Sequence, residues 1–436
     1  MTSRCNTVYP IAQRPRLAMR AISIVLMIAS GVASAADEAI LSQTAVAANA
    51  DRESDAPKVA FVTSVTGTGN LSSWTDAHGK SGIEAGDEIC RTRADAAGLD
   101  NPDMFRAWLS DATTDAYCHI QGQTGTIANH CDTFLLLGAG PWVRTDGEPF
   151  ADVIDQVVTN YRIYSPLLLD EFGMTAPGYY YTGTSQNGVS EGSDETCASW
   201  TNESSGGPPY TLLGDSASTG SSWTIAANFP CGFTHRLACL EGGSASTLPQ
   251  PSPRGGRMAF LSSTTSSGLI SFVTSTGGTL IGVAAGDARC RQLAAAANLY
   301  DPQSFKALVG TTTVPPTDRF ENDGPWSRTD GLLFARSLAE LTTGTGPVRP
   351  LNVDESGDYY DYAYAWTGPT STDTCSNWTA ADSTLLGWKG DVDKTGNRFL
   401  AWTTQSCDVQ EHVYCLSDSD VLFHDGYEGT LSGLPD

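Results

Sequence analysis

Six acidic residues recur at matched positions in the two halves of the sequence, and they are the first candidates for chemistry. They are Asp146, Asp170 and Glu171 in the first half and Asp330, Asp354 and Glu355 in the second, with Arg144 and Arg328 close by. Clustered carboxylates suit Ca²⁺, which takes several oxygen ligands, and a pair can act as general acid and base. Asp-Gly hairpins, an Arg–Asp ion pair and Asp-capped turns explain the same residues without a ligand. We favour turn chemistry and keep Ca²⁺ and catalysis as alternatives.

Four residues in the first half have the ligand types of a zinc site. They are Cys118, His119, His130 and Cys131. Adjacent Cys-His pairs do not have the spacing of zinc fingers, and the cysteines of an exported chain form disulfides by default. We therefore expect a disulfide at this place and assign no metal ligands.

A serine hydrolase is a third chemistry that the residues suggest. The segment Gly214–Ser216 resembles the nucleophile block of some esterases, and Asp408 and His412 form a distant acid–base pair. A serine nucleophile needs a base within hydrogen-bond reach, and nothing in the sequence holds His412 near Ser216. The G-x-S-x-G elbow is also absent. The sequence therefore predicts no catalytic residues, and a secreted hydrolase is kept only as the last alternative.

Aromatic residues divide into two groups. Four tryptophans recur at matched positions and are expected in the core: Trp142, Trp200, Trp326 and Trp378. Tyrosines gather at Tyr179–Tyr181 and at Tyr359–Tyr364, among Gly and Asp residues. Surface tyrosines make good contact anchors, whereas buried ones simply fill strands. We take Tyr180 and Tyr360, together with the six acids, as the candidate binding residues.

The composition sets limits on the partners of the chain. It has 436 residues, 49 acidic against 25 basic side chains and a net charge of −24. Hydrophobic residues make up 40%, which is enough for real cores and argues against wholesale disorder. A strongly acidic surface opposes binding to a phosphate backbone. Nucleic acid is therefore excluded as the expected partner.

An internal repeat is the strongest signal, and it indicates duplication. Ala85–Cys90 recurs as Ala285–Cys290, and Gly140–Gly147 recurs as Gly324–Gly331. Further matched blocks are Val59–Ser64 with Met258–Ser263, Phe105–Ser110 with Phe305–Gly310, Cys197–Trp200 with Cys375–Trp378, and Leu212–Gly214 with Leu385–Gly387. Each unit is far longer than a solenoid repeat. We expect two tandem domains, named here the first repeat (58–241) and the second repeat (258–416).

Segments outside the repeats have their own signatures. Residues 1–35 read as a secretory signal peptide, with basic residues, an apolar run and a small-x-small cleavage site ending at Ala35. Its removal takes away four arginines and no acid, which changes the net charge from −24 to −28. Residues 36–57 read as a disordered leader, 242–257 as a Gly/Ser/Pro linker and 417–436 as an acidic tail. No other stretch is apolar enough to span a membrane.

Within each repeat the patterns predict an α+β unit that is mostly β, with one or two packed helices. Val59–Ser64 alternates like a strand, and Phe105–Ser110 like a half-buried strand. Asp87–Ala97 reads as a helix with acids in its first turn. Gly98 follows it, and Asn298 stands at the same place in the second repeat. Both residues tolerate the left-handed conformation of a helix end.

The order of these blocks resembles a known family. Ala85–Cys90, Phe105–Ser110, Cys197–Trp200 and Cys239–Glu241 are similar to blocks of the endostatin domain of basement-membrane collagens. They resemble still more a family of bacterial secreted domains of unknown function that is described as endostatin-like. The resemblance covers most of both repeats and implies a compact C-type-lectin-like fold. It implies no reaction, and the zinc ligands of endostatin have no counterpart near Val59.

Ten cysteines remain after loss of Cys5 with the signal peptide. Six lie in the first repeat and four in the second, and the sequence by itself leaves their pairing open. The endostatin resemblance implies a nested pattern, which leaves one local pair: Cys90–Cys239, Cys197–Cys231 and Cys118–Cys131 in the first repeat, and Cys290–Cys415 and Cys375–Cys407 in the second.

The expected function is that of a secreted or cell-surface binding or adhesion protein, with the periplasm as an alternative compartment. It would present the candidate residues to an extracellular protein or glycan, as a monomeric two-domain chain without a cofactor and without catalysis. A Ca²⁺-dependent carbohydrate-binding module is the alternative. The acidic charge disfavours the polyanion binding associated with endostatin.

Overall fold

The computed structural model describes residues 56–133, 138–246, 248, 255–344, 346–369, 372–419 and 423–424. The predicted signal peptide lies outside these residues, as do nearly all of the leader, part of the linker and most of the tail. The described chain is α+β and rich in sheet, with few helices, which confirms the predicted fold class at that level. None of the helices within the described ranges has the length and apolar character that a membrane crossing needs.

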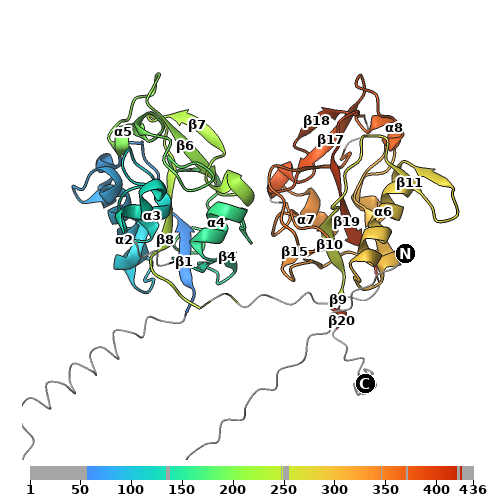
Figure 1. Ribbon diagram of the computed structural model, residues 1–436, viewed down its shortest axis with the longest axis horizontal. Coiled ribbons are helices and arrows are strands. Elements are labelled where there is room, and N and C mark those ends of the chain that lie inside the picture. Colours follow the sequence, from blue (N-terminus) through green and yellow to red (C-terminus); the bar gives the residue numbers. More distant parts are fainter. Residues whose placement is uncertain are drawn as a thin grey trace, which may run out of the picture. The chain divides into compact units, whose positions relative to one another are not determined.

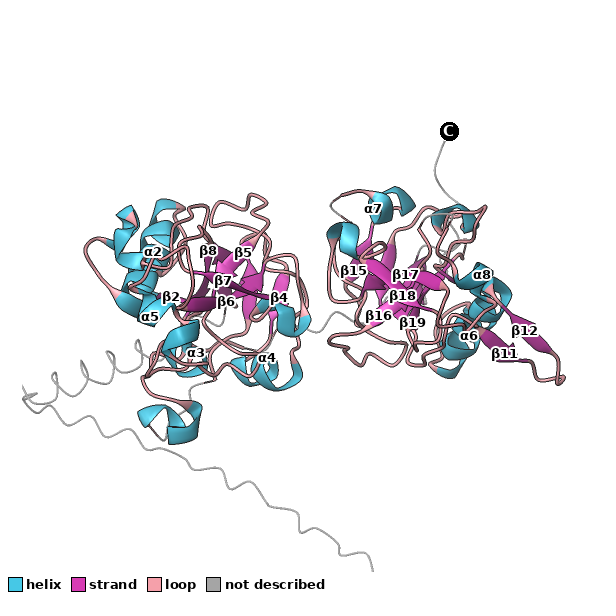
Figure 2. Cartoon of the chain, turned by 90° about the horizontal axis from the view of Figure 1, so that it is seen from above, coloured by secondary structure: helices cyan, strands magenta, loops and turns pink. Residues whose placement is uncertain are grey.

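The first repeat is built on one eight-stranded sheet (Figures 1 and 2). Its path runs β4-β3-β1-β8-β5-β6-β7, with β2 also paired to β8. Strand β1 is parallel to β3 and antiparallel to β8, and β5 is parallel to β8, so the sheet is mixed. The strands are β1 (Lys58–Val62), β2 (Phe105–Ala107), β3 (Trp142–Arg144), β4 (Pro149–Ala151), β5 (Tyr179–Tyr181), β6 (Tyr210–Asp215), β7 (Ala227–Pro230) and β8 (Arg236–Glu241).

The second repeat has a sheet with the same order and the same strand directions. Its path runs β15-β14-β10-β19-β16-β17-β18, with β13 also paired to β19. The strands are β10 (Met258–Leu261), β13 (Phe305–Ala307), β14 (Trp326–Arg328), β15 (Leu333–Ala335), β16 (Tyr364–Trp366), β17 (Leu386–Asp391), β18 (Thr403–Ser406) and β19 (His412–Ser417). Two short ribbons lie outside it, β11 (Ser271–Val273) with β12 (Thr279–Ile281) and β9 (Gly255–Gly256) with β20 (Phe423–His424).

One long helix packs on the sheet of each repeat, within the one or two packed helices that were predicted, and shorter helices accompany it. The helices of the first repeat are α2 (Gly82–Ala96), α3 (Ala116–Ile120), α4 (Ile154–Asn160) and α5 (Cys197–Trp200), and those of the second are α6 (Val283–Ala296), α7 (Leu338–Thr342) and α8 (Cys375–Trp378). Helix α2 begins five residues before the predicted start, so Asp87 is not in its first turn. Its buried carboxylate instead accepts the backbone N–H of Ala107 at 3.0 Å and ties the helix to β2.

Two predicted helix ends are confirmed, and both strands predicted in the first repeat end earlier than expected, β1 at Val62 rather than at Ser64. Gly98 and Asn298 follow α2 and α6 with φ of +69° and +55°, the left-handed conformation that Gly and Asn tolerate. Strand β2 ends at Ala107 rather than at Ser110, because the chain turns there and the N–H of Leu109 binds the carbonyl of Ala107 at 2.8 Å.

The Cys-x-x-Trp blocks form an unexpected element. All four residues of α5 have φ between +50° and +65°, and those of α8 lie between +49° and +64°, so each block is a single left-handed turn. Such a turn costs roughly 1–2 kcal/mol per residue for L-amino acids. A disulfide and a buried tryptophan hold it in both repeats, since the indole N–H of Trp200 donates to Ser110 at 2.8 Å and that of Trp378 to Gly310 at 2.6 Å.

The cysteines and tryptophans form the expected core. The five disulfides are Cys90–Cys239, Cys118–Cys131, Cys197–Cys231, Cys290–Cys415 and Cys375–Cys407, the pattern that the resemblance implied. The four recurring tryptophans are fully buried. The pairing of Cys118 with Cys131 leaves no thiolates for the zinc site considered above, and the described residues contain no group of His, Cys, Asp and Glu arranged to hold a metal ion.

Candidate functional site

The recurring Asp170 and Asp354 hold turns together. One carboxylate oxygen of Asp170 accepts the backbone N–H groups of Phe172 at 3.0 Å and Met174 at 2.9 Å. Asp354 accepts those of Ser356 at 2.8 Å and Asp358 at 3.1 Å in the same way. Both aspartates are buried. Their hydrogen bonds are those of the turn chemistry that the sequence favoured. Because both carboxylates are buried and bonded within their turns, they are not accessible to a partner.

Glu171 and Glu355 lie beneath these turns. The carboxylate of Glu171 accepts the N–H of Ser64 at 2.8 Å and its hydroxyl, and it pairs with Arg93 at 2.6 Å. Glu355 makes the matching bonds to the N–H and hydroxyl of Ser263. Because their oxygens are occupied by these donors, a ligand would have to displace them.

Asp146 and Asp330 each pair with the arginine two residues earlier. Arg144 contacts Asp146 at 2.6 Å, and Arg328 contacts Asp330 in the same geometry. Burial raises the pKa of both aspartates, but the hydrogen bonds and charge of the arginine outweigh it, so each pKa lies below its usual value. Both aspartates are therefore hairpin residues that stay charged as the ion-pair partners of Arg144 and Arg328.

The two candidate tyrosines differ from the expectation of a solvent-facing cluster. Tyr180 is completely buried, with its hydroxyl donating to the carbonyl of Trp223. The expectation that Tyr180 is a surface anchor is therefore wrong. Tyr180 belongs to the core, because it lies on a central strand of the sheet. Tyr360 is half-buried and donates to Asp354 at 3.3 Å, and burial with that carboxylate raises its pKa to about 12.

The esterase-like residues do not assemble. The hydroxyl of Ser216 is buried, and His412 lies in the other sheet, where its Nδ1 is 2.6 Å from the carbonyl of Ser262. Burial lowers the pKa of His412. No acid–base partner is therefore placed on Ser216 by the described residues.

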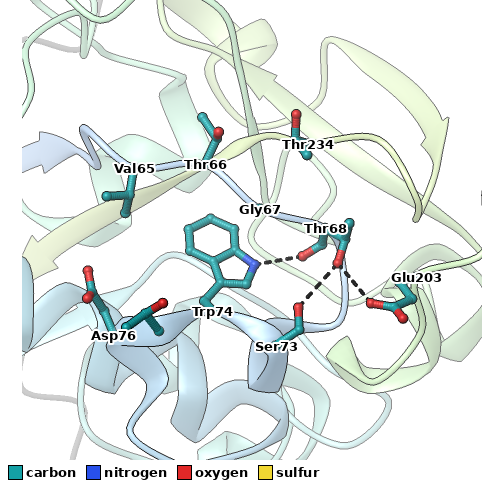
Figure 3. A pocket seen from close by; sticks show the side chains of 10 residues that line it. Val65, Thr66, Gly67, Thr68, Ser73, Trp74, Asp76, Glu203 and Thr234 are labelled. Carbon is teal, nitrogen blue, oxygen red and sulfur yellow. Dashed lines mark hydrogen bonds between the residues drawn. The ribbon is translucent and has the colours of Figure 1, made fainter.

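A hollow in the first repeat is the best candidate site (Figure 3). Its volume is about 380 Å³, within the range of small-ligand sites. Four short segments line it: Val65–Thr68 after β1, Ser73–Asp76 before α2, Glu203 after α5 and Thr234 before β8. Hydroxyl groups and two carboxylates therefore surround one indole ring.

Trp74 lies at the centre of the hollow (Figure 3), and its position is fixed from two sides. Its indole N–H donates to the carbonyl of Thr68 at 2.9 Å. A Cβ at Gly67 would lie 2.2 Å from the ring, so only glycine lets the indole lie this close to the backbone. Trp74 as a whole keeps an exposed fraction of 8%, so only a small part of it is open to the hollow.

The polar groups around the indole ring are held by contacts with one another and with Arg93. The hydroxyl of Thr68 lies 3.4 Å from the carboxylate of Glu203 and 3.5 Å from the hydroxyl of Ser73. Asp76 pairs with Arg93 at 3.5 Å, and that arginine also holds Glu171. The rim thus carries a net negative charge and hydroxyl donors, an arrangement that favours a neutral or basic ligand.

Two exposed aromatic side chains are connected to residues of the hollow: Phe172 contacts Arg93, the partner of Asp76, and Phe233 precedes Thr234 in the chain. The ring of Phe172 is 52% exposed and lies 5.5 Å from the guanidinium of Arg93. Phe233, next to Thr234, is 48% exposed and contacts Phe229 edge-on at 5.8 Å. Asp170 therefore holds a turn whose exposed side chains, Phe172 and Met174, follow the two acids.

Behind Thr234 lies a histidine enclosed by aromatic rings. The imidazole of His235 packs edge-on against Tyr179, Tyr181 and Phe229 at 5.2–6.3 Å. Burial lowers the pKa of His235 to about 4. The imidazole is therefore neutral at physiological pH.

The second repeat does not reproduce this site. A hollow of about 280 Å³ lies at the matching place, but Arg289 and strand β11 line it and no tryptophan does. The position of His235 is taken by Glu411, which pairs with Lys389 at 3.1 Å. The two repeats therefore share a scaffold and differ in the surface around it.

Comparison with known proteins adds no family to these observations. No protein-family model matches the chain, and no curated protein is significantly similar to it. The endostatin resemblance thus stays an expectation from the blocks in the sequence.

Sequence reasoning missed the hollow for a clear reason. It searched for residues that recur, whereas Trp74, Phe172 and Glu203 occur in the first repeat alone. The signal that could have found them was the difference between the repeats at matched positions, such as Phe172 against Ser356.

Proposed function

We propose that this is a secreted or cell-surface protein that binds an extracellular glycan without catalysis, at the hollow around Trp74. The observation that carries the proposal is the lining, in which hydroxyls and two carboxylates surround the indole of Trp74 within about 380 Å³. Sugar hydroxyls both donate and accept hydrogen bonds, so such a rim can satisfy them. A protein partner would be expected to bind a flatter surface, whereas this site is a hollow.

The proposal includes the endostatin-like, C-type-lectin-like character of the two repeats and their export. The repeated order of strands and the five disulfides support it, since disulfides persist in oxidising compartments. Calcium is not required in this scheme, because the recurring carboxylates already accept protein donors. A titration with Ca²⁺ followed by calorimetry tests that point, and a saturable heat together with a raised melting temperature would restore the Ca²⁺-dependent alternative.

The binding test uses a glycan array followed by calorimetry with the glycan that binds. Glu203→Gln keeps the shape of the side chain and removes the charge. Affinity should fall about tenfold, since a hydrogen bond to a charged group contributes roughly 1.5–3 kcal/mol. Glu203 is exposed, so the fold should not change.

Glu191→Gln is the matched control, because Glu191 is also exposed in the first repeat and lies outside the hollow. Equal losses in both variants would place the ligand elsewhere. An array on which no glycan binds above background would overturn the proposal itself.

A further inference from the structure

The ribbon of β11 and β12 in the second repeat exposes apolar side chains. Figures 1 and 2 show it projecting from the side of α6. Val273 is 69% exposed and Ile281 53%, and Leu280 is also exposed. A two-stranded hairpin is marginally stable by itself in water, so an uncovered ribbon of this kind calls for an explanation.

The matching segment of the first repeat shows that the fold does not require this exposure. Between Gly69 and α2 the chain forms two short 3₁₀ turns, Leu71–Ser73 and Thr75–Ala77. Their apolar residues Leu71, Trp74 and Ala77 are buried. The second repeat, between Gly268 and α6, extends the same connection outward instead.

The backbone of the ribbon leaves one strand edge open. The N–H of Thr274 binds the carbonyl of Gly278, and that of Gly282 binds Ile270. Hydrogen-bonded and non-bonded pairs alternate in an antiparallel ladder, so the N–H and C=O groups of Thr279 and Ile281 point away from β11. On the opposite edge Arg289 donates to the carbonyl of Ser271 at 3.1 Å. The edge of β12 is therefore the one available for pairing.

Charge selects the occupant of that edge. The chain carries a net charge of −24, but the segment from Gly268 to Gly282 contains no charged residue. Natural edge strands are commonly protected by charges or proline, and this edge has neither. Two copies of an acidic chain repel each other least where both surfaces are neutral, and an antiparallel edge is complementary to itself under a two-fold axis.

We propose that the β12 edge pairs with the β12 edge of a second copy of this chain and forms a four-stranded antiparallel sheet across a two-fold axis. In the register centred on Leu280, Thr279 of each copy exchanges backbone hydrogen bonds with Ile281 of the other. The two Leu280 side chains then lie opposite each other at the axis and leave water. This inference does not depend on the glycan site, and it replaces the monomer expected from the sequence.

Sedimentation equilibrium of the purified protein tests the proposal. An interface of this size lies below the standard class of about 1,200–2,000 Å², so the dimer should appear between about 1 and 200 µM. Thr279→Pro removes an outward N–H that the hairpin does not use, and it should weaken the dimer about tenfold or more. Thr279→Val keeps that N–H and should dimerise like the parent chain.

Each result decides the question. A parent chain that stays monomeric up to 200 µM overturns the proposal. This holds even if another protein is found to bind the ribbon. A dimer that Thr279→Pro does not weaken overturns the location. If Thr279→Pro lowers the melting temperature, Leu280→Lys replaces it, since a charge at the axis should abolish pairing without removing a backbone donor.

Discussion

Residues that recur in the two repeats hold the scaffold, and residues that differ between them form the surfaces. Asp170 and Asp354 accept the same two backbone N–H groups of their turns. The side chains exposed by those turns are Phe172 and Met174 in one repeat but Ser356 and Asp358 in the other. Recurrence therefore marked turn chemistry at this place, and a ligand is to be sought at the positions that vary.

Gly67 is expected to be essential for the hollow. In Gly67→Ala the new Cβ would lie 2.2 Å from the indole of Trp74, so the ring must move and the hollow must change shape. The free energy of unfolding should fall by about 1–3 kcal/mol, and the fluorescence maximum of the protein should shift. Gly206→Ala is the control, because nothing lies within 4 Å of a Cβ there. A variant as stable as the control, with unchanged fluorescence, would contradict this packing.

His235 should make the first repeat sensitive to acid. Its pKa is about 4 in the folded protein, lowered by burial from an ordinary value of 6.5. The unfolded chain therefore binds a proton below about pH 6.5 while the folded chain does not. Stability should be complete above pH 6.5 and should decline by about 2 kcal/mol as the pH falls toward 4.

His235→Phe keeps an aromatic ring among Tyr179, Tyr181 and Phe229 and removes the titrating group. Urea unfolding at a series of pH values should show a flatter profile between pH 6.5 and 4 for this variant. An identical slope in both proteins would assign the acid sensitivity to other groups.

At the scale of elements, the sequence was informative wherever a residue type is tied to one backbone conformation. Gly98 and Asn298 marked both helix ends, and the tryptophans marked the core. Strand register was less visible. Leu212–Gly214 and Leu385–Gly387 look alike, yet the bridges Thr196–Thr211 and Thr374–Gly387 make Thr211 equivalent to Gly387. The similar Leu-Leu-Gly segments are therefore offset by three residues in the structure. Backbone pairing sets the register, and the likeness of the two segments does not.

The left-handed turns could not be read from the sequence, because Ala198 and Ser199 have no preference for positive φ. Their strain is offset by the disulfide and by the buried indole of Trp200. The hollow was equally hidden, since its lining comes from four separate segments whose meeting depends on the sheet order.

This strain gives a prediction for the element itself. Ala198 has a φ of +53°, which glycine adopts without a steric cost, so Ala198→Gly should raise the free energy of unfolding by about 1 kcal/mol. The same change at Ala96, the last residue of the right-handed helix α2, should lower it by at most about 0.5 kcal/mol. Thermal and urea unfolding of the two variants should therefore shift in opposite directions. A loss of stability in both would show that the turn is not strained.

On the scale of the whole molecule, duplication has kept a scaffold and separated its surfaces. The first repeat carries the hollow with Trp74, and the second carries an uncharged ribbon at the equivalent connection. A ligand site and an association site would then lie on different copies of one fold. That division predicts that Thr279→Pro leaves glycan affinity per chain unchanged.

The last prediction follows from the overall charge and concerns the polyanion binding associated with endostatin, which this chain should lack. With a net charge of −24 and the carboxylates of Asp76 and Glu203 in the hollow, the protein should pass through a heparin column without retention. The test is strictest at about 10 mM salt, where electrostatic forces reach roughly 30 Å. Glu203→Lys should still pass through, because one local change leaves the field of the whole molecule negative. Retention of the parent protein would show that a local basic surface outweighs the total charge, and the exclusion of polyanionic ligands would then be wrong.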